Sequence, residues 1–131
     1  MIKERLHIKP TDTTPEVILD PEGFINIQGR GMVLNETRVP EQILNWLDNY
    51  LLNPAETTDV IIEFEYLNSF STTILASTLR KISQVVLLHK KLVVHWYYEE
   101  DDEDILERGE YISETLNMPI EFIMRNRIKD R

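Results

Sequence analysis

Hydroxyl side chains gather where a predicted strand, residues 59–67, gives way to a predicted helix. Six of the ten residues from 69 to 78 carry hydroxyls: Ser69, Ser71, Thr72, Thr73, Ser77 and Thr78. The first turn of a helix has unpaired N–H groups and a partial positive charge, so it accepts an anion well. A hydroxyl at this position caps the helix when unmodified, and a phosphate can use the same donors when the hydroxyl is modified. The pattern therefore allows two interpretations, a simple N-cap and a phosphorylation site.

Two other kinds of chemistry lack their sequence signatures at this junction. No Gly-rich loop and no P-loop lysine are present, so nucleotide binding is unsupported. Ser69 has no general base nearby in the sequence, which argues against a catalytic serine. From spacing alone, N-capping is the commoner of the two remaining interpretations, because Asn, Ser and Thr are favoured caps.

Six consecutive acidic residues form a second candidate site, which we call the acidic block: Glu99, Glu100, Asp101, Asp102, Glu103 and Asp104. They precede a predicted helix, where the macrodipole stabilises negative charge and where Asp101 with Asp104 can cap the first turn. A calcium loop would need alternating oxygen ligands and a central Gly, which this run lacks. A solvated helix start, a docking surface for a basic partner and a magnesium site all remain open.

Most of the excess negative charge of the chain lies in the acidic block. The sequence has 14 Lys and Arg against 23 Asp and Glu, a net charge of −9. Without the block, 17 acids would face 14 bases. The basic residues form only short clusters, Lys90-Lys91 and the tail 125–131, whereas phosphate backbones are bound by extended groups of cations. The sequence therefore argues against nucleic acid as a partner.

Three absences narrow the function further. The chain contains no cysteine, which excludes disulfides and thiolate zinc sites and suits a reducing cytoplasm. His7, His89 and His95 are scattered without metal-ligand spacing. The longest apolar run, residues 85–88, is far shorter than the roughly 20 residues of a membrane helix, and residues 1–7 do not resemble a signal peptide. We therefore expect a cytoplasmic protein with no metal, no cofactor and no membrane association.

The apolar periodicity predicts an alternation of strands and helices in one domain covering residues 1–131. Residues 17–19 and 24–28 form a hairpin around the turn 20–23, after a strand near 6–8, and Gly29–Gly31 ends the pairing. The remaining predicted elements are helix 40–52, strand 59–67, helix 70–89, strand 91–98, helix 102–116 and strand 120–124.

The alternation within strand 59–67 places Tyr66 with Val60 on one face and Leu67 on the other, and strand 91–98 is apolar enough to be covered on both faces. The order indicates an α/β fold, a mixed β-sheet packed by about three helices.

Two stretches of the chain resemble the SiaC family of bacterial regulatory phosphoproteins. They are Phe64–Ser69, running into a helix, and Val94–Asp104, with its Trp-Tyr-Tyr-acidic run. Shorter similarities lie at Thr14–Val17, Asp20–Gly23, Gly29-Arg30 and Asn45–Leu47. The resemblance covers nearly the whole chain, from Leu6 to Phe122.

This resemblance implies a STAS-like domain without catalytic activity that works in a partner-switching pathway. A serine/threonine protein kinase phosphorylates such a protein on a hydroxyl at the strand–helix junction, and a PP2C-type phosphatase restores it. The unmodified form binds and activates a diguanylate cyclase, which links the protein to cyclic di-GMP signalling and biofilm formation. Two other classes of function stay open: a metal-dependent hydrolase that uses the carboxylates of Glu99–Asp104, and a purely structural adaptor whose hydroxyls only cap a helix.

The family's phosphoacceptor is typically a Thr in a Y-[FL]-N-T-S-S pattern. The matching position in this chain is Ser69, with Ser71 and Thr72 as alternates, and the sequence continues Phe70-Ser71-Thr72-Thr73 where the family usually has S-S-[SI]-K. We expect partner contacts at the junction and at the start of the acidic block: Asn68, Phe70, Ser71, Thr72, Glu99, Glu100, Asp101 and Asp102.

Overall fold

The computed structural model describes residues 4–126 and contains one six-stranded sheet. Its strands are β1 (Leu6–Ile8), β2 (Glu16–Asp20), β3 (Phe24–Gly31), β4 (Thr57–Leu67), β5 (Lys91–Glu99) and β6 (Glu121–Arg125). They lie side by side in the order of the sequence, antiparallel from β1 to β3 and parallel from β3 to β6. Residues 127–131, most of the basic tail, lie outside the described part.

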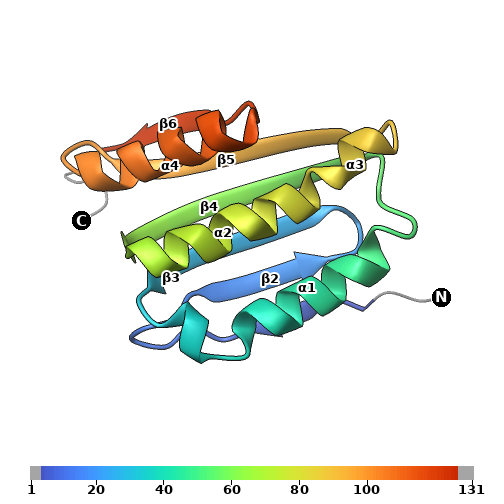
Figure 1. Cartoon of the computed structure of the whole chain (residues 1–131), viewed down its shortest axis with the longest axis horizontal. Coiled ribbons are helices and arrows are strands. Elements are labelled where there is room, and N and C mark those ends of the chain that lie inside the picture. The colour runs from blue at the N-terminus through green and yellow to red at the C-terminus, as the bar shows by residue number, and fades with distance from the viewer. Residues whose placement is uncertain (1–3, 127–131) are drawn as a thin grey trace.

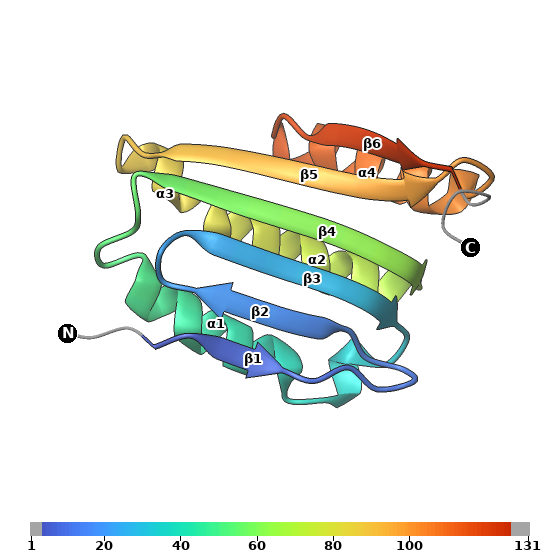
Figure 2. The same cartoon turned by 180° about the vertical axis from the view of Figure 1, so that it is seen from behind.

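Three main helices connect the parallel strands: α1 (Val39–Tyr50), α2 (Ser69–Ile82) and α4 (Glu103–Leu116). A short 3₁₀ turn, η1 (Leu34–Glu36), precedes α1, and a single turn, α3 (Gln84–Leu87), follows α2. Crossovers between parallel strands are right-handed, so three successive crossovers that advance in the same direction place their helices on the same face. Figures 1 and 2 show this arrangement, with the helices on one side of the sheet and bare strands on the other. The predicted α/β fold with a mixed sheet and three helices is confirmed.

The core lies between the sheet and these helices. Buried side chains from the middle strands meet those of the helices: Val60, Ile62, Val94, Trp96, Ile43, Leu47, Leu75, Leu79, Ile105 and Ile112. Trp96 is fully buried, and its indole Nε1 donates a hydrogen bond to the carbonyl oxygen of Ile105 at 3.1 Å. The contact satisfies the indole donor and attaches α4 to β5. Among residues 4–126, no helix is long and apolar enough to cross a membrane.

The expectation that strand 91–98 is covered on both faces is wrong. Val94 and Trp96 of β5 are buried under the helices, whereas Val93, His95 and Tyr97 point to the other face and are only half-buried. Since every crossover helix packs on one side, the described residues place no layer over the second side. We call this second side the open face.

Strand β4 also departs from a simple alternation. Gly29 of β3 pairs with Phe64 and Arg30 pairs with Tyr66, so Glu65 is an extra residue, a β-bulge. Glu65 and Tyr66 are therefore both exposed, and Leu67 returns to the buried face with Phe64, the reverse of the predicted placement. The hairpin pairing between β2 and β3 ends at Gln28, before Gly29–Gly31, as predicted, whereas the pairing between β3 and β4 continues to Gly31.

The helix predicted over 70–89 is also wrong at its C-terminal end. Helix α2 ends at Ile82, and a single helical turn, α3, follows it. The hydroxyl of Ser83 donates to the carbonyl oxygen of Arg80 at 2.6 Å, a local bond that competes with continuation of the helix. His89 has a φ of 64°, a left-handed conformation that ends the segment before β5.

Candidate functional site

The two predicted sites lie at the same edge of the sheet. Strands β4 and β5 are parallel neighbours, so their C-terminal ends meet at one edge. Helix α2 begins directly after β4, and α4 begins four residues after the end of β5, so both N-termini face this edge (Figure 1). The hydroxyl-rich junction and the acidic block, about thirty residues apart in sequence, are therefore neighbours in space.

Asn68 is the N-cap of α2. Its side-chain oxygen accepts a hydrogen bond from the backbone N–H of Ser71 at 2.9 Å, and its side-chain amide donates to the carbonyl oxygen of Met32. The backbone N–H of Asn68 donates to the carbonyl oxygen of Gly31 at 3.1 Å. Asn68 therefore caps α2 and attaches the start of this helix to the end of β3. The Ser69 hydroxyl is consequently not needed as the N-cap.

The hydroxyls of the junction differ strongly in exposure. Ser69 is exposed, and Phe70 beside it is 70% exposed. Ser71 is fully buried and Thr72 is 5% exposed. The hydroxyl of Thr72 also donates to the carbonyl oxygen of Asn68 at 2.7 Å. An enzyme can therefore reach Ser69 on the folded protein, whereas Ser71 and Thr72 become accessible only if the first turn opens.

A surface hollow of about 390 Å³ lies between α2 and α4 and is called here the junction hollow. It is lined by Ser69, Thr72, Thr73, Asp104, Glu107, Arg108 and Tyr111. The guanidinium of Arg108 donates from Nε to Asp104 Oδ2 at 3.1 Å and from one terminal nitrogen to Thr72 Oγ1 at 3.1 Å. The hollow thus holds the exposed Ser69 hydroxyl, one cation and part of the acidic block.

Sequence reasoning missed Arg108 and Tyr111. The spacing of Asp104 and Arg108, four residues apart on a helix, could have indicated their ion pair. No sequence signal could have indicated the contact between Arg108 and Thr72, because 36 residues separate them and the packing of α4 beside α2 brings them together.

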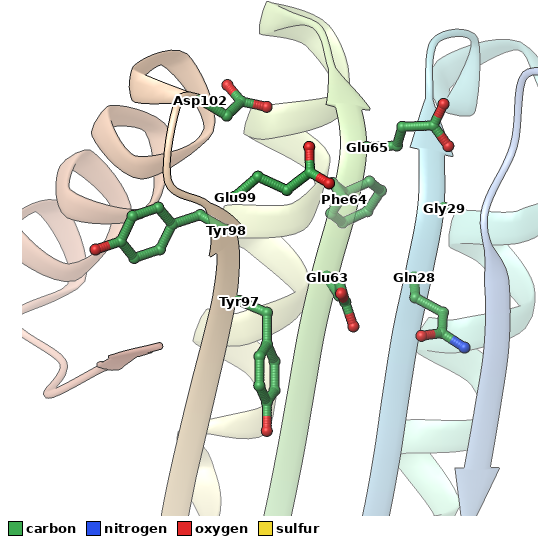
Figure 3. A pocket seen from close by; sticks show the side chains of 9 residues that line it. All are labelled: Gln28, Gly29, Glu63, Phe64, Glu65, Tyr97, Tyr98, Glu99 and Asp102. Carbon is green, nitrogen blue, oxygen red and sulfur yellow. The ribbon is translucent and has the colours of Figure 1, made fainter. Parts of the chain in front are cut away.

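A second hollow, of about 450 Å³, opens on the C-terminal ends of β3, β4 and β5 and is called here the sheet-edge pocket (Figure 3). It is lined by Gln28, Gly29, Glu63, Phe64, Glu65, Tyr97, Tyr98, Glu99 and Asp102. Four of these side chains are carboxylates. Glu99 and Asp102 come from the acidic block, and Glu63 and Glu65 come from β4.

The sheet-edge pocket already has one guanidinium at its border. Arg125 of β6 lies with Nε 2.8 Å from Glu63 Oε2, and its guanidinium carbon lies 4.3 Å from the centroid of the Tyr97 ring. A carboxylate and an aromatic face together favour a planar cation. The border of the pocket therefore has the chemistry that binds a guanidinium, and Arg125 of this chain occupies it.

A short polar chain borders this pocket on the open face. The side-chain amide of Gln28 donates to Glu16 at 3.1 Å, and the His7 ring lies 2.9 Å from the same carboxylate. These hydrogen bonds, first from Gln28 and then from His7, lower the pKa of Glu16. Glu16 therefore stays ionised under acidic conditions that protonate an ordinary glutamate, and its bond restrains Gln28.

The acidic block divides between several roles. Asp102 is the N-cap of α4 and accepts from the backbone N–H of Ile105 at 3.1 Å, where Asp101 and Asp104 had been predicted to cap. Glu100 and Asp101 are exposed in the turn before the helix. Within residues 4–126, no three His, Asp or Glu side chains are grouped so that they could hold a metal ion. The metal-dependent hydrolase therefore gains no support from the described structure.

Comparison with known proteins identifies the family of this chain. Residues 8–125 match the SiaC family regulatory phosphoprotein, and the chain belongs to this family. An uncharacterized protein of Pseudomonas aeruginosa is 23% identical over 115 residues, which span 87% of this chain and 91% of that protein.

Two solved structures of SiaC from Pseudomonas aeruginosa share the fold. The apo form has a TM-score of 0.77 at 22% identity and covers 90% of this chain and 97% of its own. The structure of the diguanylate cyclase SiaD in complex with its activator SiaC has a TM-score of 0.81 at 21% identity, with 92% and 99% covered. The resemblance to a regulatory phosphoprotein family is thereby confirmed, and the family is regulatory rather than catalytic.

Proposed function

We propose that this chain is a cytoplasmic partner-switching protein controlled by phosphorylation of Ser69. In the unmodified state it binds and activates a diguanylate cyclase and so feeds cyclic di-GMP signalling, including biofilm formation. A serine/threonine protein kinase switches it off, and a PP2C-type phosphatase restores it. The main support for this proposal is that Ser69 is exposed in the first turn of α2, a helix that Asn68 already caps.

The surroundings of Ser69 support its use as a switch. Phe70, next to Ser69, is 70% exposed, Tyr111, which lines the same hollow, is 61% exposed, and Tyr66, at the end of β4, is 44% exposed. Exposed aromatic residues are frequent anchors of protein interfaces. A partner that covers these rings also covers Ser69. The SiaD complex of a family member supports a cyclase as that partner.

Phosphorylation would act on the interface more than on the fold. A phosphate adds about −1.5 to −2 charge at pH 7, and the free N–H groups of the first turn of α2 can stabilise it. A partner packed over Phe70 would instead have to desolvate this dianion, which costs several kcal/mol without a matching cation. Modified protein should therefore remain folded and lose its partner.

The direct test begins with the acceptor. A serine/threonine protein kinase from the same genome is incubated with the protein, and the intact mass and the modified site are determined. Modification of wild type on Ser69 and none of Ser69→Ala is the expected result. Modification on Ser71 or Thr72 would move the acceptor, and it would require the first turn to open.

The effect on the partner is measured with Ser69→Asp and the cyclase. We expect the affinity to fall at least 100-fold, about 2.7 kcal/mol, while the melting temperature hardly changes. Ser77→Asp, an exposed serine on the same helix, is the control and should bind like wild type. The regulatory function would be refuted if Ser69→Asp bound every partner normally and no kinase modified this junction. The structural adaptor would then be the remaining hypothesis.

The sheet-edge pocket is proposed as the part of the interface that attracts a basic partner surface. Neutralising Glu65 and Glu99 of the pocket and the adjacent Glu100 with Gln should slow association and flatten its salt dependence, because charges at the rim of an interface act mainly on the encounter rate. The matched control neutralises Glu22, Asp48 and Glu56, which lie toward the opposite edge of the sheet. Equal association rates for both triple variants would remove the docking role of the pocket.

A further inference from the structure

Arg108 is the one cationic side chain among the residues that line the junction hollow. It belongs to α4, whereas Ser69 belongs to α2. Arg108 of α4 reaches across to α2 and donates to Thr72 Oγ1 at 3.1 Å. Its side chain is 24% exposed, and two of its guanidinium nitrogens are engaged with Asp104 and Thr72, so the group is only partly hydrated. A partly desolvated guanidinium interacts more strongly with an anion than one in bulk water does.

Ser69 lies one helical turn from Thr72, the residue of α2 that this guanidinium contacts. Ser69 and Thr72 are three residues apart in α2, so they share a helix face, and both line the junction hollow. The first turn of α2 contains no acidic residue. The groups of α2 that face Arg108 are therefore uncharged hydroxyls, and an anion created at Ser69 would meet no negative charge on its own helix.

In the unmodified protein Arg108 has a weaker anionic partner on its own helix. Its Nε lies 3.1 Å from Asp104, a carboxylate that is 66% exposed, and Glu107 also lines the hollow. Ion pairs between residues four apart on a helix are weak when the carboxylate is mostly exposed to water, as Asp104 is. A phosphate dianion offers more charge and three acceptor oxygens, which match the fork of a guanidinium.

We propose that Arg108 is the phosphate-binding side chain of the switch: when Ser69 is phosphorylated, the Arg108 guanidinium leaves Asp104 and Thr72 and pairs with the phosphate. Asp104 is the competing partner that holds Arg108 in the unmodified state. The exchange breaks the hydrogen bond from α4 to Thr72 and alters the contact between α2 and α4 beside Tyr111. This inference rests on the proposed function for its claim that the cell phosphorylates Ser69, and its chemistry can be tested separately.

The test uses full-length protein in which phosphoserine is incorporated at position 69 during translation, so that no kinase is needed. Phosphorus NMR follows the second ionisation of the phosphate. The groups facing it are the first-turn N–H donors and hydroxyls of α2 and the side chains of Asp104, Glu107, Arg108 and Tyr111 from α4. A guanidinium in contact favours the dianion, so the pKa of the phosphate should lie at least about one pH unit below that of phosphoserine placed at the exposed position 77.

Three variants isolate the contribution of Arg108. With Arg108→Gln the phosphate pKa should rise by about one pH unit, with Arg108→Lys it should rise less, and with Asp104→Asn it should fall. The helix N-terminus is the same in all of them, so differences between variants report the side chains of α4. If Arg108→Gln impairs folding, Arg108→Lys and Asp104→Asn still move the pKa in opposite directions according to the proposal.

Equal phosphate titrations in wild type, Arg108→Gln and Arg108→Lys would overturn the role of Arg108. Kinase modification of Ser69 in the first experiment would then leave the proposed function standing. Conversely, the phosphate pKa could depend on Arg108 while no kinase modifies Ser69. This result would support the pairing of Arg108 with the phosphate and refute the proposed function. The two hypotheses therefore fail on different measurements.

Discussion

Helices α2 and α4 begin at the same edge of the sheet but carry different chemistry in their first turns. Helix α2 is capped by the neutral Asn68 and has no acidic residue in its first turn. Helix α4 is capped by Asp102 and has Glu103 and Asp104 in its first turn. The partial positive charge of α4 is thus already met by carboxylates, whereas that of α2 is not. Of the two ends, α2 is the one at which a new anion is favoured.

The comparison depends on where α4 packs on the sheet beside α2, and Gly109 lets α4 approach β5 and β6 closely. A Cβ atom at Gly109 would come within 2.6 Å of the Trp96 indole and 2.8 Å of the Phe122 ring. Gly109→Val should therefore lower the free energy of unfolding by about 3 kcal/mol and move Arg108 away from Thr72. Chemical denaturation measures this change, and Glu110→Val, at the exposed neighbouring position, is the control. Equal stability of the two variants would contradict the packing.

The caps differ in the number of bonds they make. Asn68 accepts from Ser71 and donates to the carbonyl oxygen of Met32. Asn68→Ala removes both bonds and should cost about 2 kcal/mol. The loss should appear in thermal and denaturant unfolding, and Asn68→Ser, which retains a cap acceptor, should recover roughly half of it.

The cap of α4 should matter less. Asp102 accepts from the N–H of Ile105, and Glu103 and Asp104 stay in the first turn after it is removed. Asp102→Ala should therefore cost about 1 kcal/mol. Denaturant unfolding of this variant and of Asn68→Ala under the same conditions gives the comparison. A larger loss for Asp102→Ala would show that the acidic turn, and not the junction, secures this edge of the sheet.

The smallest effects should have opposite signs at the two helices. Ser69→Asp adds a charge to the unneutralised end of α2 and should raise the free energy of unfolding by a few tenths of a kcal/mol. Asp104→Asn removes a charge from α4, together with its ion pair to Arg108, and should lower it by about 0.5 kcal/mol. Both changes should shrink at high salt. The same sign for both variants would mean that the two ends do not differ electrostatically.

Much of the fold could be predicted because its signals are local. The spacing of Ile43, Leu47 and Tyr50 predicted α1, and alternation predicted the start of β4. The turn residues between β2 and β3 predicted their hairpin. Each of these signals depends on neighbours within a few residues, so the order and type of the elements follow from the chain alone.

The errors lie where distant parts of the chain decide. Whether β5 is covered on one face or two depends on the hand of the crossovers, and the bulge at Glu65 depends on pairing with β3. The end of α2 at Ile82 is a local exception, because the bond from Ser83 to Arg80 competes with the helix and the apolar periodicity does not indicate it.

The candidate site shows the same division. The hydroxyls, the acidic block and the resemblance to a regulatory family are properties of the sequence. Helices α2 and α4 pack side by side on adjacent parallel strands. This packing brings the hydroxyls close to the acidic block, buries Ser71 and Thr72, and forms the contact from Arg108 to Thr72. Exposure and long-range contacts are set by which faces meet in three dimensions, and a linear pattern of residue types does not contain that information.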